Sequence, residues 1–533
     1  MKKKLLLLLI MFIPFFINAL EVEKEWQKSF GGTGSEYVSS AIPSEDGGFF
    51  LVGSSKSSTL DTLINNGSRD AILIKYDNNG NIIWKTNWGG NDDDSFFHAI
   101  EFEDKSIILV GNSESTNING ITNKGHTDAI IVKYDSEGNM LWQKNWGDTL
   151  TDSFYYSTKV NNDNFIAVGS KKTSDVTFKA VIIKYDKDGT ILWEKEWGGS
   201  QVDVFYSVAQ TKDNGFIVVG DSKSNGTDTS PNVDKAKGII IKYDSEGNLI
   251  WEREWGGLLE EHLCSVVVTE NNEFLIIGDS KSTDIPNITN AGNKDGIILK
   301  YDNNGNLLFE KSWGGNLDEY FPTVALAEKE NFIVTGCTNS TNIEGLTNKG
   351  DCDAIILKYD KNGKLLWKQN WSEEGYETFK KVLIHPTKSS IYAIGYSTLT
   401  NMNDLTSKGE DDFLIVKYNI DYTIEKKPTE NGSIEAFQED RSGVIIPKSE
   451  KDYKVDKIIV KDTQGNEIKT TLGENGIYTF ELYDDVTVEV LFALAVDNPK
   501  TGILNYGFIV VLFMIIPILG MLYISRYNQK YGL

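Results

Sequence analysis

Residues 74–90 read IKYDNNGNIIWKTNWGG, a phrase in which Tyr-Asp, a glycine turn and two tryptophans follow in fixed order. Close relatives of the phrase recur at 132–148 (VKYDSEGNMLWQKNWGD), 183–199 (IKYDKDGTILWEKEWGG), 241–257 (IKYDSEGNLIWEREWGG), 299–315 (LKYDNNGNLLFEKSWGG) and 357–373 (LKYDKNGKLLWKQNWSE). Its tyrosine stands at positions 76, 134, 185, 243, 301, 359 and 418, so a unit of 51 to 59 residues occurs seven times. A repeat with this period decides the fold.

Each unit contains four strand-like runs separated by Gly, Asn and Asp, as in VFYSVAQT (204–211), GFIVVGDS (215–222), GIIIKYD (238–244) and NLIWEREW (248–255). The second and third runs are almost continuously apolar, which is typical of strands covered on both faces. A four-stranded sheet buries both faces when it packs between two neighbours, and radial packing of such sheets gives a β-propeller. A solenoid fits less well, because β-solenoid coils are shorter than this repeat and are capped at their ends.

The chain also indicates how the ring is closed. An outer-strand signature, W-x3-[WF], occurs at Trp26/Phe30, Trp84/Trp88, Trp142/Trp146, Trp193/Trp197, Trp251/Trp255, Phe309/Trp313 and Trp367/Trp371. The first lies before any complete unit, and the last tyrosine, Tyr418, is followed by NIDYTIEKK, which has neither the turn glycine nor the Trp pair. We therefore expect the strand Val22–Phe30 to complete the seventh blade, which removes an open sheet edge.

The repeat resembles the seven-bladed bacterial β-propeller repeat, often abbreviated SBBP. The resemblance rests on D-A-[IL]-[IL]-[ILV]-K-Y-D-x-x-G-N-x-x-W, followed by Gly-Gly and by an acid four residues on. It implies the fold over about four hundred residues and implies little about a ligand.

The predicted fold is all-β: a seven-bladed propeller closed by its N-terminal strand, then a small β domain and a C-terminal transmembrane helix. The segments expected are 1–19, a signal peptide; 20–424, the propeller; 425–494, a β spacer; and 495–533, a sorting signal with its helix and basic tail. The spacer resembles the bacterial repeat domain related to the internalin B-repeat, through YKVDKIIVKDTQGNEI and YTFELYDDVTV. That resemblance implies a module that holds the propeller away from the cell wall.

Both ends carry export features. Residues 1–19 join a basic start to an apolar run that ends at Ala19, which predicts a cleaved signal peptide; a membrane-anchoring helix is the alternative. Near the other end, Asn498-Pro499-Lys500-Thr501-Gly502 precedes the apolar run Tyr506–Ile524 and a short basic tail. This order resembles the sorting signals of Gram-positive surface proteins, in which a sortase joins the Thr to peptidoglycan. A plain transmembrane anchor remains the alternative.

Composition excludes several functions. The formal net charge is −24, so nucleic acid is not an expected partner. Four scattered histidines and three cysteines show no metal-ligand spacing, and no cofactor or metal is expected. No isolated group of His, Asp and Ser indicates a nucleophile and base, and the ring holds only Arg69 and Arg253, where sialidases bind substrate with three arginines. We therefore expect that the protein is not an enzyme.

Two charged positions recur in all seven units. An acid follows the Gly-Gly position at Glu36, Asp94, Asp152, Asp203, Glu261, Glu319 and Glu377. A lysine precedes the tyrosine at Lys75, Lys133, Lys184, Lys242, Lys300, Lys358 and Lys417. The structural interpretation pairs each lysine with an acid, because buried lysine needs a counter-charge. The functional interpretation places the acids around one mouth of the central channel, where they bind a cation.

The loops between the second and third strands are long and rich in Ser, Thr and Asn, and loops on a rigid scaffold are a usual place for binding. The alternative is that they only cover the blade edges. Cys337 and Cys352 flank one such loop, at the ends of adjacent antiparallel strands, an arrangement that is compatible with a disulfide. Cys264 aligns with Tyr and Phe in other units, which favours a core position.

Together these features predict an exported surface protein, anchored to the cell wall or the membrane at its C-terminus. Its propeller is expected to be a non-enzymatic binding or adhesion platform for a protein or a glycan. The expected partners are sortase and peptidoglycan through Thr501, an unidentified protein or glycan ligand, and the membrane through residues 503–524 before processing. The alternative function is a glycan-processing ectodomain of hydrolase or lyase type.

Overall fold

The computed structural model describes residues 21–161, 163–224, 235–385, 389–398, 401–402, 405–406 and 408–495. These residues are all-β, and the helical segments among them are two three-residue 3-10 turns, Glu328–Glu330 and Glu474–Gly476. Two compact units can be separated. The first holds the chain through Thr423 with the short segments Gln438–Ser442 and Leu482–Asp485, and the second holds the rest.

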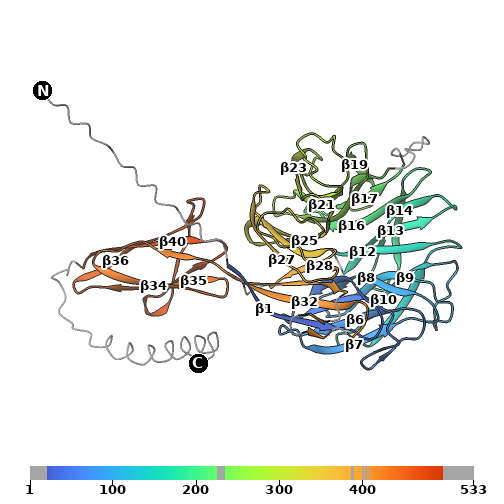
Figure 1. Ribbon diagram of the computed structural model, residues 1–533, viewed down its shortest axis with the longest axis horizontal. Helices are drawn as coiled ribbons and strands as arrows, with labels where there is room; N and C mark the ends of the chain where they lie inside the picture. The colour runs from blue at the N-terminus through green and yellow to red at the C-terminus, as the bar shows by residue number, and fades with distance from the viewer. Residues whose placement is uncertain are drawn as a thin grey trace. The chain divides into compact units, whose positions relative to one another are not determined.

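Seven four-stranded antiparallel sheets make up the described part of the first unit (Figure 1). Numbered along the chain, sheets one to three are β2 (Glu36–Pro43), β3 (Phe49–Ser55), β6 (Asp70–Tyr76), β7 (Ile82–Trp88); β8 (Asp94–Glu101), β9 (Ile107–Ser113), β10 (Asp128–Tyr134), β11 (Met140–Trp146); and β12 (Asp152–Val160), β13 (Asn164–Lys172), β14 (Phe178–Tyr185), β15 (Ile191–Trp197). Sheets four to six are β16 (Asp203–Gln210), β17 (Phe216–Ser222), β18 (Lys237–Tyr243), β19 (Leu249–Trp255); β20 (Glu261–Val268), β21 (Phe274–Ser280), β22 (Asp295–Tyr301), β23 (Leu307–Trp313); and β24 (Glu319–Leu326), β25 (Phe332–Thr338), β26 (Asp353–Tyr359), β27 (Leu365–Trp371).

Sheet seven combines strands from the beginning and the end of the first unit. It consists of β28 (Glu377–Ile384), β29 (Ser390–Ser397), β32 (Asp412–Asp421) and β1 (Glu21–Phe30), with β1 antiparallel to β32. Two short hairpins lie outside the sheets, β4 (Thr59–Leu60) with β5 (Leu63–Ile64) and β30 (Asn401–Met402) with β31 (Leu405–Thr406).

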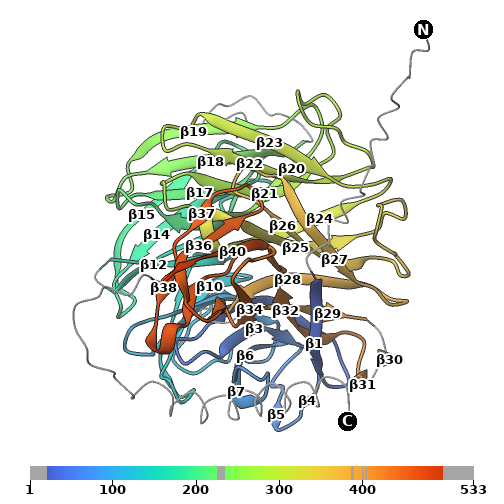
Figure 2. The same ribbon diagram turned by 90° about the vertical axis from the view of Figure 1, so that its left-hand side faces the viewer.

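The first strands of the sheets, which we call the inner strands, neighbour one another in order from β2 to β28, and β28 neighbours β2. Outer strands such as β7, β15, β19 and β23 lie at the periphery (Figure 2). Seven apolar clusters fill the spaces between adjacent sheets, and one of them packs Leu51 and Ile74 of sheet one against Ile394 and Ile415 of sheet seven. This explains why the second and third strands are apolar on both faces, because each face meets a neighbouring sheet.

The repeated phrase forms the third strand, a turn and the outer strand. In the first copy, the Asp77 carboxylate accepts hydrogen bonds from the backbone of Asn79 and Asn81, and Gly80 takes a positive φ of 69°. A side chain at Gly80 would collide with the ring of Trp26, which belongs to the outer strand of sheet seven. The turn glycine therefore serves two purposes, the backbone conformation and the contact with a neighbouring tryptophan.

Sheet seven contacts sheets one and six through the same hydrogen bonds that join other neighbouring sheets. The Trp88 indole donates to Gln143 of the next outer strand at 2.7 Å, and the Trp371 indole donates to Gln27 of β1 at 2.9 Å. Likewise the Asp94 backbone N–H donates to Arg69 O of the preceding sheet at 2.9 Å, as that of Glu36 does to Asp411 O at 2.9 Å. In its contacts β1 therefore stands where an outer strand stands in the other sheets.

The second unit contains two four-stranded sheets within its described residues. Their orders are β33–β40–β36–β37 and β34–β35–β39–β38. The strands are β33 (Ile424–Lys426), β34 (Gly432–Glu439), β35 (Ser442–Ser449), β36 (Tyr453–Asp462), β37 (Glu467–Ile468), β38 (Thr471–Leu472), β39 (Tyr478–Glu481) and β40 (Val486–Leu494). Alternating side chains such as Ile445, Val488 and Val490 are buried.

The predicted signal peptide 1–19, the motif Asn498–Gly502 and the apolar segment 503–524 lie outside the described residues. Within the residues that the structure does describe, no helix has the length and apolar character needed to cross a membrane.

Candidate functional site

The cation interpretation required the seven recurring acids to line an open channel mouth. They do not. Each is fully buried, with 0% of its surface exposed. Glu36 accepts hydrogen bonds from the hydroxyls of Ser55 at 2.7 Å and Ser57 at 2.5 Å, and from the backbone of Gly32 at 2.8 Å. Asp203 repeats this arrangement with Ser222, Ser224 and Gly199. In these sheets the acid links the Gly-Gly turn to a Ser-x-Ser segment that ends the second strand and begins the loop.

The expected pairing of each recurring acid with a recurring lysine is wrong as well. The two residues lie at opposite ends of the strands of their sheet. In sheet one, Glu36 is level with Ser55, whereas Lys75 is level with Phe50, five residues along β3. Five residues of strand span about 17 Å. Lys75 instead pairs with Asp46, in the turn between β2 and β3, at 3.0 Å.

Three of the other lysines follow the same rule. Lys242 pairs with Asp213, Lys300 with Glu273 and Lys358 with Glu328, all acids of the turn that precedes the second strand. Lys417 pairs with Glu25 of β1, and Lys133 and Lys184 donate to the backbone carbonyls of Lys187 and Ser245. These lysines are structural groups.

Burial also changes the acidity of the recurring acids. Desolvation raises the pKa of Asp94 to about 6, that of Asp152 to about 6 and that of Glu377 to about 7. The carboxylate of Asp70, from the preceding sheet, adds to the rise in the pKa of Asp94. The two carboxylates lie on either side of Gly89: a Cβ at that glycine would be 2.6 Å from Asp70 Oδ1 and 2.7 Å from Asp94 Oδ2. Among the described residues no group of three or more His, Cys, Asp or Glu side chains could hold a metal ion.

A cavity of about 370 Å³ lies between the inner strands. We call it the chamber. Its lining comes mainly from the residues three and four positions after each recurring acid, such as Phe97 and His98 after Asp94. Pockets that bind small molecules measure roughly 300 to 1,000 Å³, so the chamber has room for a small ligand or the end of a chain.

A β-bulge in every inner strand produces this lining. The register with the second strand shifts between Val38 and Ser40 in β2 and between Phe96 and His98 in β8, and at the equivalent place in the other five inner strands. A bulge leaves a residue out of the ladder and re-aims its side chain. The residues at the bulge differ in almost every sheet: Ser39, Phe97, Tyr155, Tyr206, Cys264, Pro322 and Lys380.

One side of the chamber is aromatic. The rings of Phe97 and Tyr155 have centroids 5.6 Å apart, and those of Tyr155 and Tyr206 are 5.7 Å apart, so three adjacent sheets form a continuous arc. Below it, His98 stacks on Tyr156 at 3.7 Å and its Nδ1 lies 3.2 Å from Ser157 Oγ. Burial holds the pKa of His98 well below its usual range, so this imidazole is neutral at pH 7.

The opposite side is cationic. Lys380 and Lys381 extend from β28 of sheet seven. Lys381 reaches across the chamber to sheet three, where its Nζ lies 5.7 Å from the centroid of the Tyr156 ring. Burial lowers the pKa of Lys380. The remaining charges of the lining are paired: Lys294 contacts Asp279 at 3.3 Å, and His262 contacts Asp221, which raises the pKa of the imidazole.

Cys264 lines the chamber and is half-buried, so its predicted core position is wrong. Burial raises the pKa of its thiol well above the usual range, which keeps it protonated and unreactive. The signal for the chamber was present in the sequence as the positions where the units disagree, but the bulge that brings them together was not.

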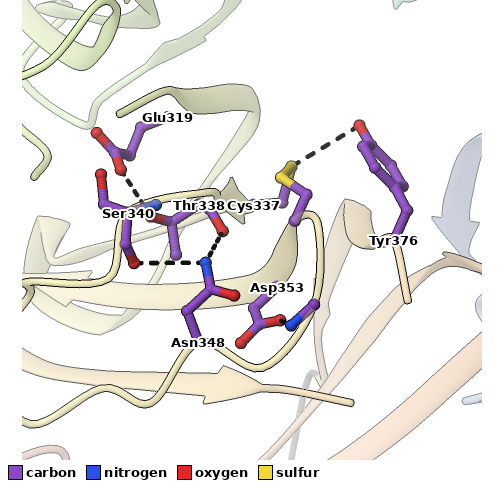
Figure 3. The surroundings of a disulfide bond; sticks show 9 residues. Glu319, Cys337, Thr338, Ser340, Asn348, Asp353 and Tyr376 are labelled. Atoms are coloured by element: carbon purple, nitrogen blue, oxygen red, sulfur yellow. Dashed lines mark hydrogen bonds between the residues drawn. A yellow bond between two sulfur atoms is a disulfide. The ribbon is translucent and has the colours of Figure 1, made fainter. Parts of the chain in front are cut away.

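The long loops are tied to the sheets by repeated hydrogen bonds. Asn65, Asn123, Asn290 and Asn348 each donate to the backbone carbonyl of the residue that ends the second strand of their own sheet. In sheet six a disulfide joins Cys337 to Cys352 with their Cα atoms 5.7 Å apart, both fully buried (Figure 3). Tyr376 of sheet seven lies next to it, its hydroxyl 3.9 Å from Cys337 Sγ.

Comparison with known proteins supports a propeller built from repeats. A profile of the family described as outer membrane protein assembly factor BamB matches residues 69–258. The regulatory protein FlaEY of Caulobacter vibrioides is 26% identical over 191 residues, 31% of this chain and 19% of that protein. The uncharacterized WD repeat-containing protein L264 of Acanthamoeba polyphaga mimivirus is 25% identical over 201 residues, 34% of this chain and 14% of that protein. The matches thus span less than a fifth of the length of these relatives.

Solved structures show a likeness of fold alone. Sqt1 from Chaetomium thermophilum gives a TM-score of 0.41 at 11% identity and covers 80% of this chain and 97% of its own. YCF48 bound to a D1 peptide gives 0.41 at 12% identity, with 76% and 96% covered. The polysaccharide lyase Uly1 gives 0.39 at 11% identity, with 75% and 99% covered.

Proposed function

We propose that this chain is an exported surface protein whose propeller is a non-enzymatic binding platform, with the chamber as its ligand site. Sheets one to seven are the blades of a closed seven-bladed propeller of SBBP type, and β1 is the closing strand. The pairing of β1 with β32 and the Trp371 contact with Gln27 support this closure.

One observation carries the binding proposal. The acid, the turn glycine and the apolar strands are kept from sheet to sheet, whereas the bulge at the inner strand presents serine, phenylalanine, tyrosine, cysteine, proline or lysine to one cavity. A purely structural position repeated seven times would hold similar residues, because it satisfies equivalent environments. Variation confined to one concave surface of a rigid scaffold is the pattern expected of a binding site.

The chamber also favours binding over catalysis. Its histidines are either neutral and stacked, as His98 is, or paired with a carboxylate, as His262 is with Asp221. Its thiol is protonated. The hydroxyl next to His98 belongs to Ser157, which is buried and does not line the chamber, so we infer no covalent mechanism.

A screen of the purified full chain on glycan and matrix-protein arrays, read for both binding and product release, tests the platform. We expect binding without turnover. Sugar turnover would favour the alternative, a glycan-processing ectodomain of hydrolase or lyase type, for which the sugar-sized chamber is the supporting observation.

We also propose that the segment from Asn498 to Gly502 is a sortase signal that joins Thr501 to peptidoglycan, with the internalin B-repeat-like spacer between propeller and wall. Residues 503–524 would hold the chain in the membrane before processing. Fractionating cells that express the wild type or a T501A variant tests this. Sortase anchoring requires the wild type in the wall fraction and the variant in the membrane, whereas a plain membrane anchor leaves both in the membrane.

A further inference from the structure

Two lysines of the chamber have no acidic partner. Lys380 and Lys381 stand side by side on β28, and within the described part of the chain no carboxylate lies within ion-pair distance of either ammonium group. Other charges of the same cavity are matched, as Asp279 is by Lys294. The chain carries 77 acidic residues against 53 basic ones, so the missing partner is a local feature of this cavity.

Leaving two ammonium groups in a partly enclosed site is unfavourable. Both side chains are half-buried, and each lies beside an aromatic ring: Lys380 Nζ is 5.9 Å from the centre of Tyr396 and Lys381 Nζ is 5.7 Å from that of Tyr156. A cation over an aromatic face gains less free energy than a charge-assisted hydrogen bond to an anion provides. An anionic group in the chamber, in contact with these ammonium groups, would supply the missing interaction.

The rest of the lining indicates what carries that anion. Seven of the fifteen lining residues bear a hydroxyl group, among them Ser39, Ser265 and Thr323, and the arc of Phe97, Tyr155 and Tyr206 offers flat apolar faces. Hydroxyl groups both donate and accept hydrogen bonds, which matches a ligand covered with hydroxyls of its own. A sugar ring has such hydroxyls at its edge and C–H groups on its faces, and aromatic side chains provide contact area for those faces.

We propose that the chamber binds an acidic sugar, with its carboxylate or sulfate at Lys380 and Lys381 and its ring against the arc of Tyr155 and Tyr206. This deepens the proposed binding platform and rests on it. A cationic ligand is disfavoured by the two ammonium groups, and a duplex nucleic acid is far too wide for a cavity of about 370 Å³.

Titration calorimetry of the full chain with three matched trisaccharides tests the proposal. The terminal residue is glucuronic acid in one, glucose 6-sulfate in the second and glucose in the third. We expect the acidic probes to bind about tenfold more tightly than the neutral one or better, and the gain to shrink at high salt. The stronger of the two acidic probes identifies the acid group. Equal affinity for all three would overturn the proposal.

Three variants locate the binding. K380M and K381M should each reduce the affinity for the acidic probe about tenfold or more, and should leave the affinity for the neutral probe unchanged. K212M is the matched control, because Lys212 is an exposed lysine paired with Glu270 outside the chamber. Its affinity should stay within about twofold of wild type. Equal losses in K212M would mean a general charge effect and would contradict the site.

S39E guards against a folding artefact. Ser39 lies in the chamber on β2, the neighbour of β28, and a carboxylate there gives the lysines a partner instead of removing them. S39E should keep the thermal stability and lose the preference for acidic probes. If arrays identify a neutral glycan or a protein ligand whose binding ignores all the lysine variants, this inference fails and the platform stands. If no array or probe yields a ligand, both fail.

Discussion

The two ends of one inner strand differ in what they keep. In β8, Asp94 is fully buried, and its carboxylate accepts hydrogen bonds from Ser113, Ser115 and Gly90, an arrangement that Glu36 and Asp203 repeat in their own sheets. Three residues further on, Phe97 stands at a bulge and faces the chamber, where the other sheets present unrelated side chains. The first position holds the sheets together and the second is free to specialise.

The largest loss of stability is expected where the backbone itself is in contact. A Cβ at Gly111, in the second strand of sheet two, would collide with the Ser95 carbonyl oxygen of β8. G111A should therefore lower the free energy of unfolding by about 3–5 kcal/mol, since strand backbone must move. All twelve tryptophans lie between residues 26 and 371, so their fluorescence during denaturant unfolding reports on the first unit. N112A, at the next position, should cost about 1 kcal/mol; equal losses would contradict this view.

Removing the acid should cost nearly as much, and removing its chamber neighbour much less. D94A leaves two serine hydroxyls and the Gly90 N–H without an acceptor in a buried site, which we expect to cost about 2–4 kcal/mol. F97S removes a half-buried ring from the chamber wall and should cost about 1 kcal/mol. The same fluorescence measurement decides. A larger loss for F97S would make the chamber a structural core.

The acid should also give a signature in pH. The pKa of Asp94 is raised to about 6 in the folded state, from 3.8. The folded state then binds the proton more tightly, so this group contributes stability below about pH 4 that is lost as pH rises through 6. Lowering the pH from 7 to 4.5 should stabilise wild type relative to D94N by about 2 kcal/mol. E246Q, at an exposed acid, should track wild type; the absence of a pH-dependent gap for D94N would refute the raised pKa.

The smallest effect concerns the pairing of β1 with the last sheet. Trp88 and Trp371 are each 6% exposed and each donates to a glutamine of the next outer strand, Gln143 and Gln27. W88F and W371F should therefore cost the same, about 1–2 kcal/mol. A loss for W88F with none for W371F would show that β1 does not act as an outer strand in solution.

The comparison also marks how far sequence reasoning reaches. The Trp pairs and the Tyr-Asp turn predicted the strands, and the orphan Trp26/Phe30 pair predicted the pairing of β1 with the last sheet, because edge pairing and apolar faces follow from local pattern. The pairing of each recurring acid with a recurring lysine was predicted wrongly. The spacing of the two residues in the sequence does not show that they lie at opposite ends of the second strand. The Ser-x-Ser segment that follows the second strand in sheets one, two, four and five was the signal that could have identified the true partners of the acids.

The chamber escaped prediction for another reason. A bulge is a backbone irregularity that no residue of the inner strand specifies by itself, since the bulged residue ranges from Ser39 to Lys380. Without the bulge, the alignment of Cys264 with Tyr and Phe in other units suggested a core position. The long loops drew the prediction of binding instead, although Asn65 and its equivalents fasten them to the sheets.

The most direct test compares a substitution in the chamber with a substitution in a long loop. The affinity of the full chain for the glucuronate-terminated trisaccharide is measured for wild type, for Y155S in the chamber and for N119A, an exposed residue of the loop in sheet two. The account predicts a loss of about tenfold or more for Y155S and no change for N119A. A loss confined to N119A would place the binding site on the loops and contradict the central claim.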